Sequence, residues 1–199
     1  MVVKKDTTLG NVLSLPMIYG LGTAIAAYVN AEVIFLLRDE DYFAVDASEI
    51  GRVSSDILFY ALLFTLLLSI GVGYLFDMFG RRTIIMGSLY VMALVVLLMP
   101  YTAPSIVLLT CLRIVLALGT QFTHSHPLVV DYIKAESRGK ATALQSLGSV
   151  VGECFTFLVL MTATMNMEVA NGFALVAVVI LVLTTSLLFM IREPDLSKK

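Results

Sequence analysis

Three ionisable side chains interrupt long apolar runs of this sequence, and they are its strongest candidates for chemistry. Glu32, Arg113 and Glu153 each lie inside a different run. A charged side chain in an apolar environment is costly, so such a residue usually binds a charged solute, carries a proton or forms a buried ion pair. The sequence leaves two interpretations of Arg113 open, a cavity-lining cation and a structural ion pair.

Arg113 belongs to a polar face on one side of a predicted helix. The members of this face recur every three or four residues: Thr110, Arg113, Ala117, Thr120 and His124. A second series with the same spacing surrounds Glu153: Thr142, Gln145, Ser149, Glu153 and Thr156. A polar face in an apolar environment must look towards protein or water. Both series therefore predict helix faces directed at a cavity or at a neighbouring helix.

Glu32 has a less polar setting than the other two. Only Tyr28 adds polarity to its helical face, so an interfacial carboxylate and a cavity carboxylate are both compatible with the sequence. Glu32 and Arg113 lie at similar depths in their runs, which makes an ion pair between them one hypothesis. Glu153 is the competing partner for the arginine, and a carboxylate at this depth could instead carry a proton.

The composition indicates a membrane protein. The chain is 59% hydrophobic and 14% charged with a mean hydropathy of +0.94, whereas soluble domains have about 25% charged residues. Six apolar segments each approach the roughly 20 residues that cross a bilayer as a helix. They are residues 12–37, 57–76, 83–99, 105–127, 141–165 and 170–191. The predicted fold is an all-α, integral membrane six-helix bundle over residues 12–192.

Basic residues predict the orientation of the bundle. Ten lysines and arginines fall before the first segment or after the second, fourth and sixth, and only Arg38 and Arg52 fall on the other side. Such an excess marks the cytoplasmic side of a membrane protein. We therefore expect both termini there, as residues 1–11 and as residues 193–199, a tail or the start of a linker. The acidic loop 38–56 is expected on the outer side.

Residues 73–82 lie between the second and third segments and combine an acid, a turn glycine and two arginines, Gly-Tyr-Leu-Phe-Asp-Met-Phe-Gly-Arg-Arg. This stretch resembles the signature loop of the major facilitator superfamily, G-x-L-x-D-x-x-G-R-[RK]. The matching positions are Gly73, Leu75, Asp77, Gly80, Arg81 and Arg82. Met78 departs from the basic residue that the family often has there.

Two further segments resemble the same family. Arg113 and Gly119 match part of its fourth-helix motif, R-x-x-Q-G-x-G, in which the arginine faces the central cavity of many proton-coupled members. The segment that starts at Asp131 resembles the family's loop after the fourth helix, an acid followed by R-G-x-x-x-A-L. The resemblance implies that Asp131 contacts Arg81 or Arg82 and that this cluster is a conformational latch.

The resemblance covers the whole chain but only half of the usual family length. It implies the N-terminal half of a transporter, built of two inverted three-helix repeats. The expected function is to move a small polar solute by alternating access with a second six-helix half or a homodimer mate. Arg113 leaves two interpretations open, an anionic solute and proton coupling through Glu32 or Glu153. The alternative is a structural subunit of a larger membrane complex that transports nothing. Besides the lipid bilayer and the solute we expect no nucleic acid, cofactor or metal, and no enzymatic activity, because the sequence has no motif for them.

Overall fold

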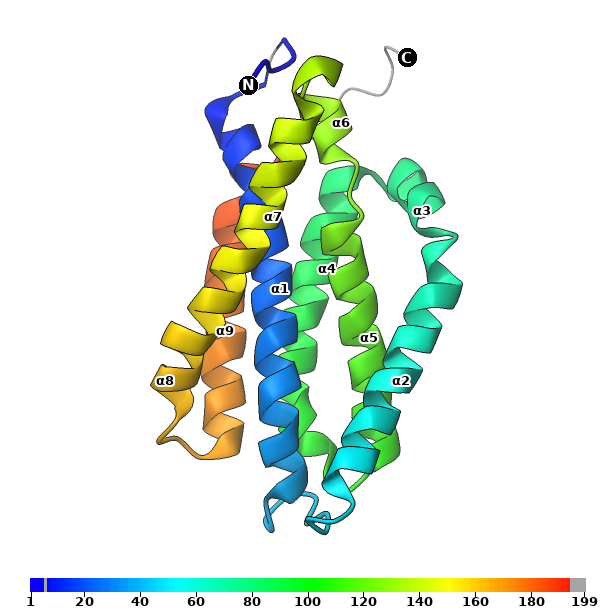
Figure 1. Ribbon diagram of the computed structural model, residues 1–199, viewed down its shortest axis with the longest axis vertical. Helices are drawn as coiled ribbons and strands as arrows, with labels where there is room; N and C mark the ends of the chain where they lie inside the picture. The colour runs from blue at the N-terminus through cyan, green and yellow to red at the C-terminus, as the bar shows by residue number, and fades with distance from the viewer. Residues whose placement is uncertain (6, 194–199) are drawn as a thin grey trace.

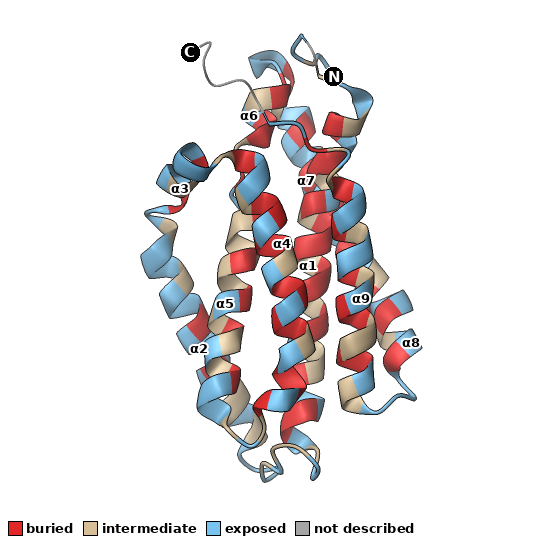
Figure 2. Cartoon of the chain, turned by 180° about the vertical axis from the view of Figure 1, so that it is seen from behind, coloured by how far each residue is buried: buried red, intermediate tan, exposed pale blue. Residues whose placement is uncertain are grey.

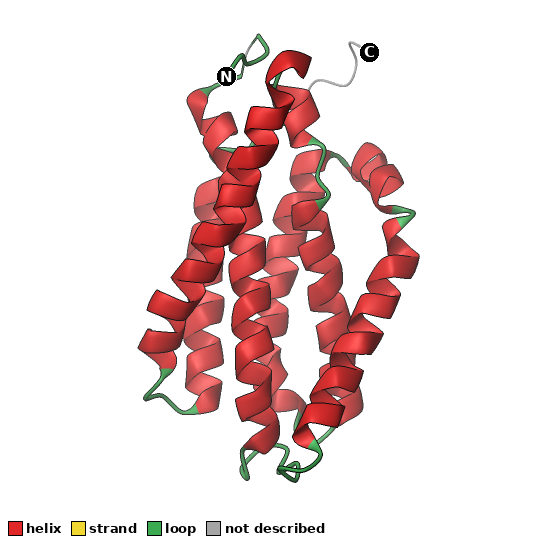
Figure 3. Cartoon of the chain, viewed as in Figure 1, coloured by secondary structure: helices red, strands yellow, loops and turns green. Residues whose placement is uncertain are grey.

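The chain is a bundle of long helices that run side by side (Figure 1). A computed structural model describes residues 1–5 and 7–193 of the 199 residues. Within those ranges every regular element is helical, and one isolated antiparallel bridge joins Val3 to Ile133 (Figure 3). Of the expected tail, only Glu193 is among the described residues.

In the described part of the chain, six segments are long and apolar enough to cross a membrane, as the apolar runs predict. The helices are α1 Leu9–Arg38, α2 Ile50–Ser69, α3 Val72–Phe79, α4 Arg81–Leu98, α5 Ile106–His124, α6 Leu128–Tyr132, α7 Arg138–Phe155, α8 Met161–Thr164 and α9 Val169–Leu187. A 3-10 turn at Met99–Thr102 extends α4, and another at Ala135–Ser137 precedes α7. A π-helical turn at Thr156–Leu160 joins α7 to α8.

The second span differs from its expected position. Helix α2 begins at Ile50 rather than near residue 57, because polar turns around Arg52 are helical although they precede the apolar run. It ends at Ser69, and Val72–Phe79 form the separate helix α3. The stretch expected to be a loop is therefore mostly helical. The chain reverses at Gly80, whose φ of 85° is cheap only for glycine.

Helix α1 is the central element of the bundle. It contacts α7, α5, α9 and α2, and much of its length is buried (Figure 2). In contrast, only Ile57 and Ala61 of α2 are buried. Because the exposed surface of α2 is apolar, it needs lipid or another membrane protein against it.

Helices α1 and α7 are in backbone contact. A Cβ atom built at Gly148 would lie 2.2 Å from the carbonyl oxygen of Pro16, and one at Gly152 would lie 2.1 Å from that of Gly20. Real Cβ atoms do not approach backbone this closely, so no larger residue fits without separating the helices. Small residues four apart permit such close packing of membrane helices.

The N-terminal segment and the residues that follow α9 lie at the same end of the bundle (Figure 1). The backbone N–H of Lys4 donates to the carbonyl oxygen of Tyr132 at 2.8 Å. The Tyr132 hydroxyl donates to the carbonyl oxygen of Arg192 at 2.6 Å. The amide nitrogen of Asn11 donates to the carbonyl oxygen of Met190 at 2.7 Å. The N-terminal segment, α6 and the residues after α9 are thereby tied together.

The loop between α1 and α2 lies at the opposite end and is acidic. Asp46 accepts hydrogen bonds from the backbone N–H of Ser48 at 2.8 Å and from its hydroxyl at 2.6 Å. Both bonds lower the pKa of the Asp46 carboxyl, so it remains ionised at neutral pH. The loop also reaches the turn before α9, where the Tyr42 hydroxyl donates to Glu168 at 3.4 Å.

Candidate functional site

Arg113 lines a polar cavity between α1, α2 and α5. The cavity has a volume of about 190 Å³. Its polar lining residues are Asn30, Thr65, Arg113, Thr120, Gln121 and His124. We call this hollow the arginine cavity. Arg113, Ala117, Thr120 and His124 come together here because their spacing places them on one face of α5, as predicted. Thr110 lines a different hollow between α2 and α5.

Arg113 is only 5% exposed, and its hydrogen-bond partner is an amide. Its Nη2 donates to Oδ1 of Asn30 at 2.5 Å. Among the described residues no carboxylate forms a salt bridge with it, and its buried Nε has no partner. The guanidinium therefore has no neutralising neighbour among the described residues, and at least one donor is left over.

The hypothesis of an Arg113–Glu32 ion pair is wrong. Glu32 lines another cavity, between the far end of α1 and the segment from α8 to α9. Asn30 and Glu32 are two residues apart, which turns them about 200° from each other around a helix with 3.6 residues per turn. Residue 30 therefore faces Arg113 and residue 32 faces away from it. Similar depth in the membrane did not bring the charges together.

The competing partner, Glu153, does not meet Arg113 either. It is exposed on the surface of α7 and makes no salt bridge within the described part of the chain. Gln145 is buried on the same helix. Tyr28 is 1% exposed and packs edge-on against Phe173, with 5.6 Å between ring centroids. None of these three residues lines the arginine cavity.

A chain of hydrogen bonds leads from the arginine cavity across α1 to α7. Nε2 of His124 lies 3.1 Å from the Thr23 hydroxyl, which donates to the Ser149 hydroxyl at 3.1 Å. The Tyr19 hydroxyl donates to the carbonyl oxygen of His124. Sequence reasoning identified His124 and Ser149 but missed Thr23 and Asn30. Both are polar residues inside the first apolar run, and this position could have marked them as candidate site residues.

A buried ion pair lies near the end of the bundle that holds the N-terminal segment and the residues after α9. Nε of Arg81 is 2.6 Å from Oδ2 of Asp131, and the two side chains are 5% and 6% exposed. Asp77 lies 3.5 Å from Nη2 of Arg81 and is 73% exposed. The expected contact of Asp131 with the arginine pair is therefore made by Arg81, and Asp77 is a peripheral member of the cluster. Gly73 has open space around it.

Glu193 caps the N-terminus of α4, which the sequence did not reveal. Its two carboxylate oxygens accept the backbone N–H groups of Arg81 at 2.8 Å and Arg82 at 2.7 Å. The guanidinium of Arg82 donates to the carbonyl oxygen of Leu188 at 2.8 Å. A carboxylate at this end of a helix satisfies free N–H groups and is favoured by the helix dipole. The first residues after α9 are thus fastened to the signature segment.

Comparison with known proteins shows the family of the chain. The family model of the Major Facilitator Superfamily matches residues 7–199. The chain belongs to this superfamily. Its members are membrane transporters rather than enzymes.

Among solved structures, the chain is similar to that of the proton:xylose symporter XylE bound to 6-bromo-6-deoxy-D-glucose. The TM-score is 0.71 at 14% sequence identity, a level that shows a shared fold alone. The similarity covers 92% of this chain and 45% of XylE, so the chain spans about half of that transporter's length. No match was found among curated proteins.

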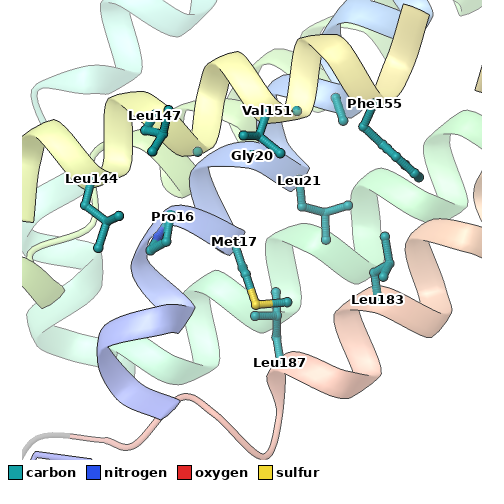
Figure 4. Close-up of a pocket in the computed structure, with 13 residues that line it drawn as sticks. Pro16, Met17, Gly20, Leu21, Leu144, Leu147, Val151, Phe155, Leu183 and Leu187 are labelled. Atoms are coloured by element: carbon teal, nitrogen blue, oxygen red, sulfur yellow. The ribbon is translucent and has the colours of Figure 1, made fainter. Parts of the chain in front are cut away.

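A further hollow on this facilitator-superfamily chain is an apolar groove. It holds about 360 Å³ between α1, α7 and α9 (Figure 4). Its lining side chains are all apolar, among them Met17, Leu144, Phe155 and Leu183. A polar solute would lose its hydrogen bonds to water there without replacement. The arginine cavity is therefore the better candidate for a solute site.

The charge cluster predicts unequal effects of two matched substitutions. Asp131→Asn should destabilise the fold by about 3–5 kcal/mol, because it leaves the buried Arg81 without its main partner. Asp77→Asn removes an exposed contact and should cost about 0–1 kcal/mol. Thermal unfolding of both variants in maltoside micelles measures the difference. Equal losses of stability would contradict the assignment of Asp131 as the main partner of Arg81.

Proposed function

We propose that this chain forms one half of a facilitator-type secondary transporter, which moves a small anionic solute by rocking against a second six-helix half. The observation that carries this proposal is the buried Arg113, whose charge no carboxylate neutralises within the described residues. Taking such a charge out of water is expensive unless a counter-charge arrives. An anionic solute would supply that charge while it is bound.

The donors around Arg113 suit a carboxylate or a phosphate group. A guanidinium has five N–H donors in a rigid fork and binds two oxygens of one anion at once. Asn30 occupies a donor on Nη2, and the buried Nε has no partner in the described part of the chain. Thr120, Gln121 and His124 add further polar groups on the same helix. The solute would therefore be held by α5 and oriented by α1.

The size of the arginine cavity supports a second half. Small-molecule sites usually hold about 300–1,000 Å³, more than the roughly 190 Å³ enclosed by this chain. Facilitator-type binding sites lie between two halves of the protein. A second half would complete the walls and would also cover the apolar surface of α2.

The charge cluster would serve as the latch of this rocking motion. The ion pair of Arg81 and Asp131 and the cap made by Glu193 hold the signature segment rigidly to the rest of the half. Asp77 leaves most of its carboxylate exposed at the same end, where a second half can contact it. We therefore assign Asp77 to contacts between halves and Asp131 to the stability of this half.

The cytoplasmic placement of both termini belongs to the same proposal, and the distribution of basic residues supports it. It is tested with Cys111 and Cys154 replaced by alanine, because both thiols are exposed. A cysteine at Ala47, in the loop before α2, should then react with a membrane-impermeant maleimide added from outside. A cysteine at Glu136 should not react. The reverse pattern would contradict the orientation.

Solute binding is tested by the thermal stability of the chain in the presence of inorganic phosphate, lactate, succinate or a neutral pentose. We expect at least one anion to raise the melting temperature saturably and the pentose to have no effect. Arg113→Gln should weaken that anion's binding at least about tenfold, because the charged donors are lost. Arg113→Lys keeps the positive charge but loses the forked pair of N–H donors. Its affinity for the anion should therefore lie between those of the wild type and Arg113→Gln.

Glu32→Gln is the matched control, because Glu32 faces away from the arginine cavity. Anion binding should be the same in this variant as in the wild type. Stabilisation by the pentose alone, or by anions equally well in Arg113→Gln, would contradict an anion site at Arg113.

A further inference from the structure

The cavity that Glu32 lines contains two acidic side chains, Glu32 and Glu168. It lies between the far end of α1, the π-helical turn, α8 and the start of α9, and it holds about 460 Å³. Its lining residues include Tyr28, Glu32, Phe35, Phe157, Met161 and Glu168. We call it the glutamate cavity. We propose that it binds an organic cation, an ammonium group that carries apolar substituents.

Charge is the first argument for a cation. Glu32 and Glu168 come from two different elements, and the described residues that line the cavity include no lysine, arginine or histidine. Among the described residues neither carboxylate forms a salt bridge. Glu168 accepts hydrogen bonds from the amide of Asn171 at 3.1 Å and from the Tyr42 hydroxyl at 3.4 Å, and both of these donors are neutral. Within the described residues the cavity therefore has no positive charge beside the half-buried Glu32 and the exposed Glu168.

The walls of the cavity select the kind of cation. Phe35 and Phe157 supply two accessible aromatic rings, and Met161 supplies a polarisable thioether. Aromatic faces attract ammonium groups, and methionine adapts its shape to varied apolar ligands. A bare inorganic cation such as Ca²⁺ instead needs six to eight oxygens at about 2.3–2.6 Å. A cavity of this size with a mostly apolar lining fits an ammonium ion with alkyl groups better.

The glutamate cavity is independent of the arginine cavity. The two lie on opposite sides of α1 and have no lining residue in common. Tyr28 is buried against Phe173 and α9, so the floor of the glutamate cavity is fixed by packing and not by Arg113. Cation binding is therefore expected whether or not the proposed anion transport is correct.

The probe for this site is radiolabelled tetraethylammonium, measured by equilibrium dialysis with the chain in maltoside micelles, a detergent that has no ammonium group. We expect saturable binding that Glu32→Gln and Glu168→Gln each weaken at least about tenfold. Glu136→Gln removes an exposed carboxylate at the other end of the bundle and should bind like the wild type. Arg113→Gln should also bind tetraethylammonium like the wild type.

Elution volume and melting temperature show which variants are folded. If Glu32→Gln does not fold, Glu168→Gln, which changes a residue outside the helices, decides the question. Absence of saturable binding to the wild type would overturn the proposal. So would equal binding by the wild type and the folded variants of the two lining glutamates.

The ammonium group could belong to a soluble cation or to a lipid headgroup, and a second arm separates these sources. Tetraethylammonium binding is compared in nanodiscs of digalactosyldiacylglycerol and of phosphatidylcholine, which are both uncharged overall. Weaker binding in phosphatidylcholine alone would show that the choline headgroup occupies the glutamate cavity. Equal binding in both lipids would assign the cavity to a soluble cation. Either result supports an ammonium site.

Discussion

The backbone contact between α1 and α7 is the constraint on which the rest of the structure depends. Gly20 on α1 faces Gly148 and Gly152 on α7, and no side chain separates the two helices. This contact fixes both the height and the rotation of α1 in the middle of the bundle. Rotation matters most, because each face of α1 serves a different neighbour.

The rotation of α1 places its two polar residues in different cavities. Asn30 points to α5 and binds Arg113, while Glu32 points to α8 and α9. The positive and negative groups are thus held apart by the width of one helix rather than paired. A paired arrangement would neutralise both charges and leave neither cavity with a preference for ions. This separation is what the proposed anion site and the proposed cation site both require.

Much of this fold could be predicted from the sequence. The six spans follow from apolar runs, because hydrocarbon solvates neither charges nor open backbone. The contact of Asp131 with the arginine pair followed from the family resemblance. The start of α2 at Ile50 could not be read from hydrophobicity, because its first turns are polar and lie outside the apolar run.

The partners of the charged residues were harder to predict, since they depend on contacts distant in sequence. Depth in the membrane suggested Glu32 for Arg113, but the angle around α1 selected Asn30. Successive residues of a helix are turned by 100°, so Asn30 and Glu32 could not both have faced Arg113. The cap by Glu193 joins residues more than 110 positions apart, and no local pattern announces it.

The same substitution at three glycines tests the central claim most directly. Gly148→Ala and Gly152→Ala each add a Cβ within about 2 Å of the α1 backbone and should destabilise the fold by about 1–3 kcal/mol. Gly87→Ala adds the same atom on α4, where nothing lies within 4 Å of it. Because alanine has a higher helix propensity than glycine, the stability of this variant should be unchanged or raised by up to about 1 kcal/mol. Thermal unfolding of the three variants in nanodiscs gives the comparison. Melting of Gly148→Ala and Gly152→Ala at or above the wild-type temperature would contradict the account.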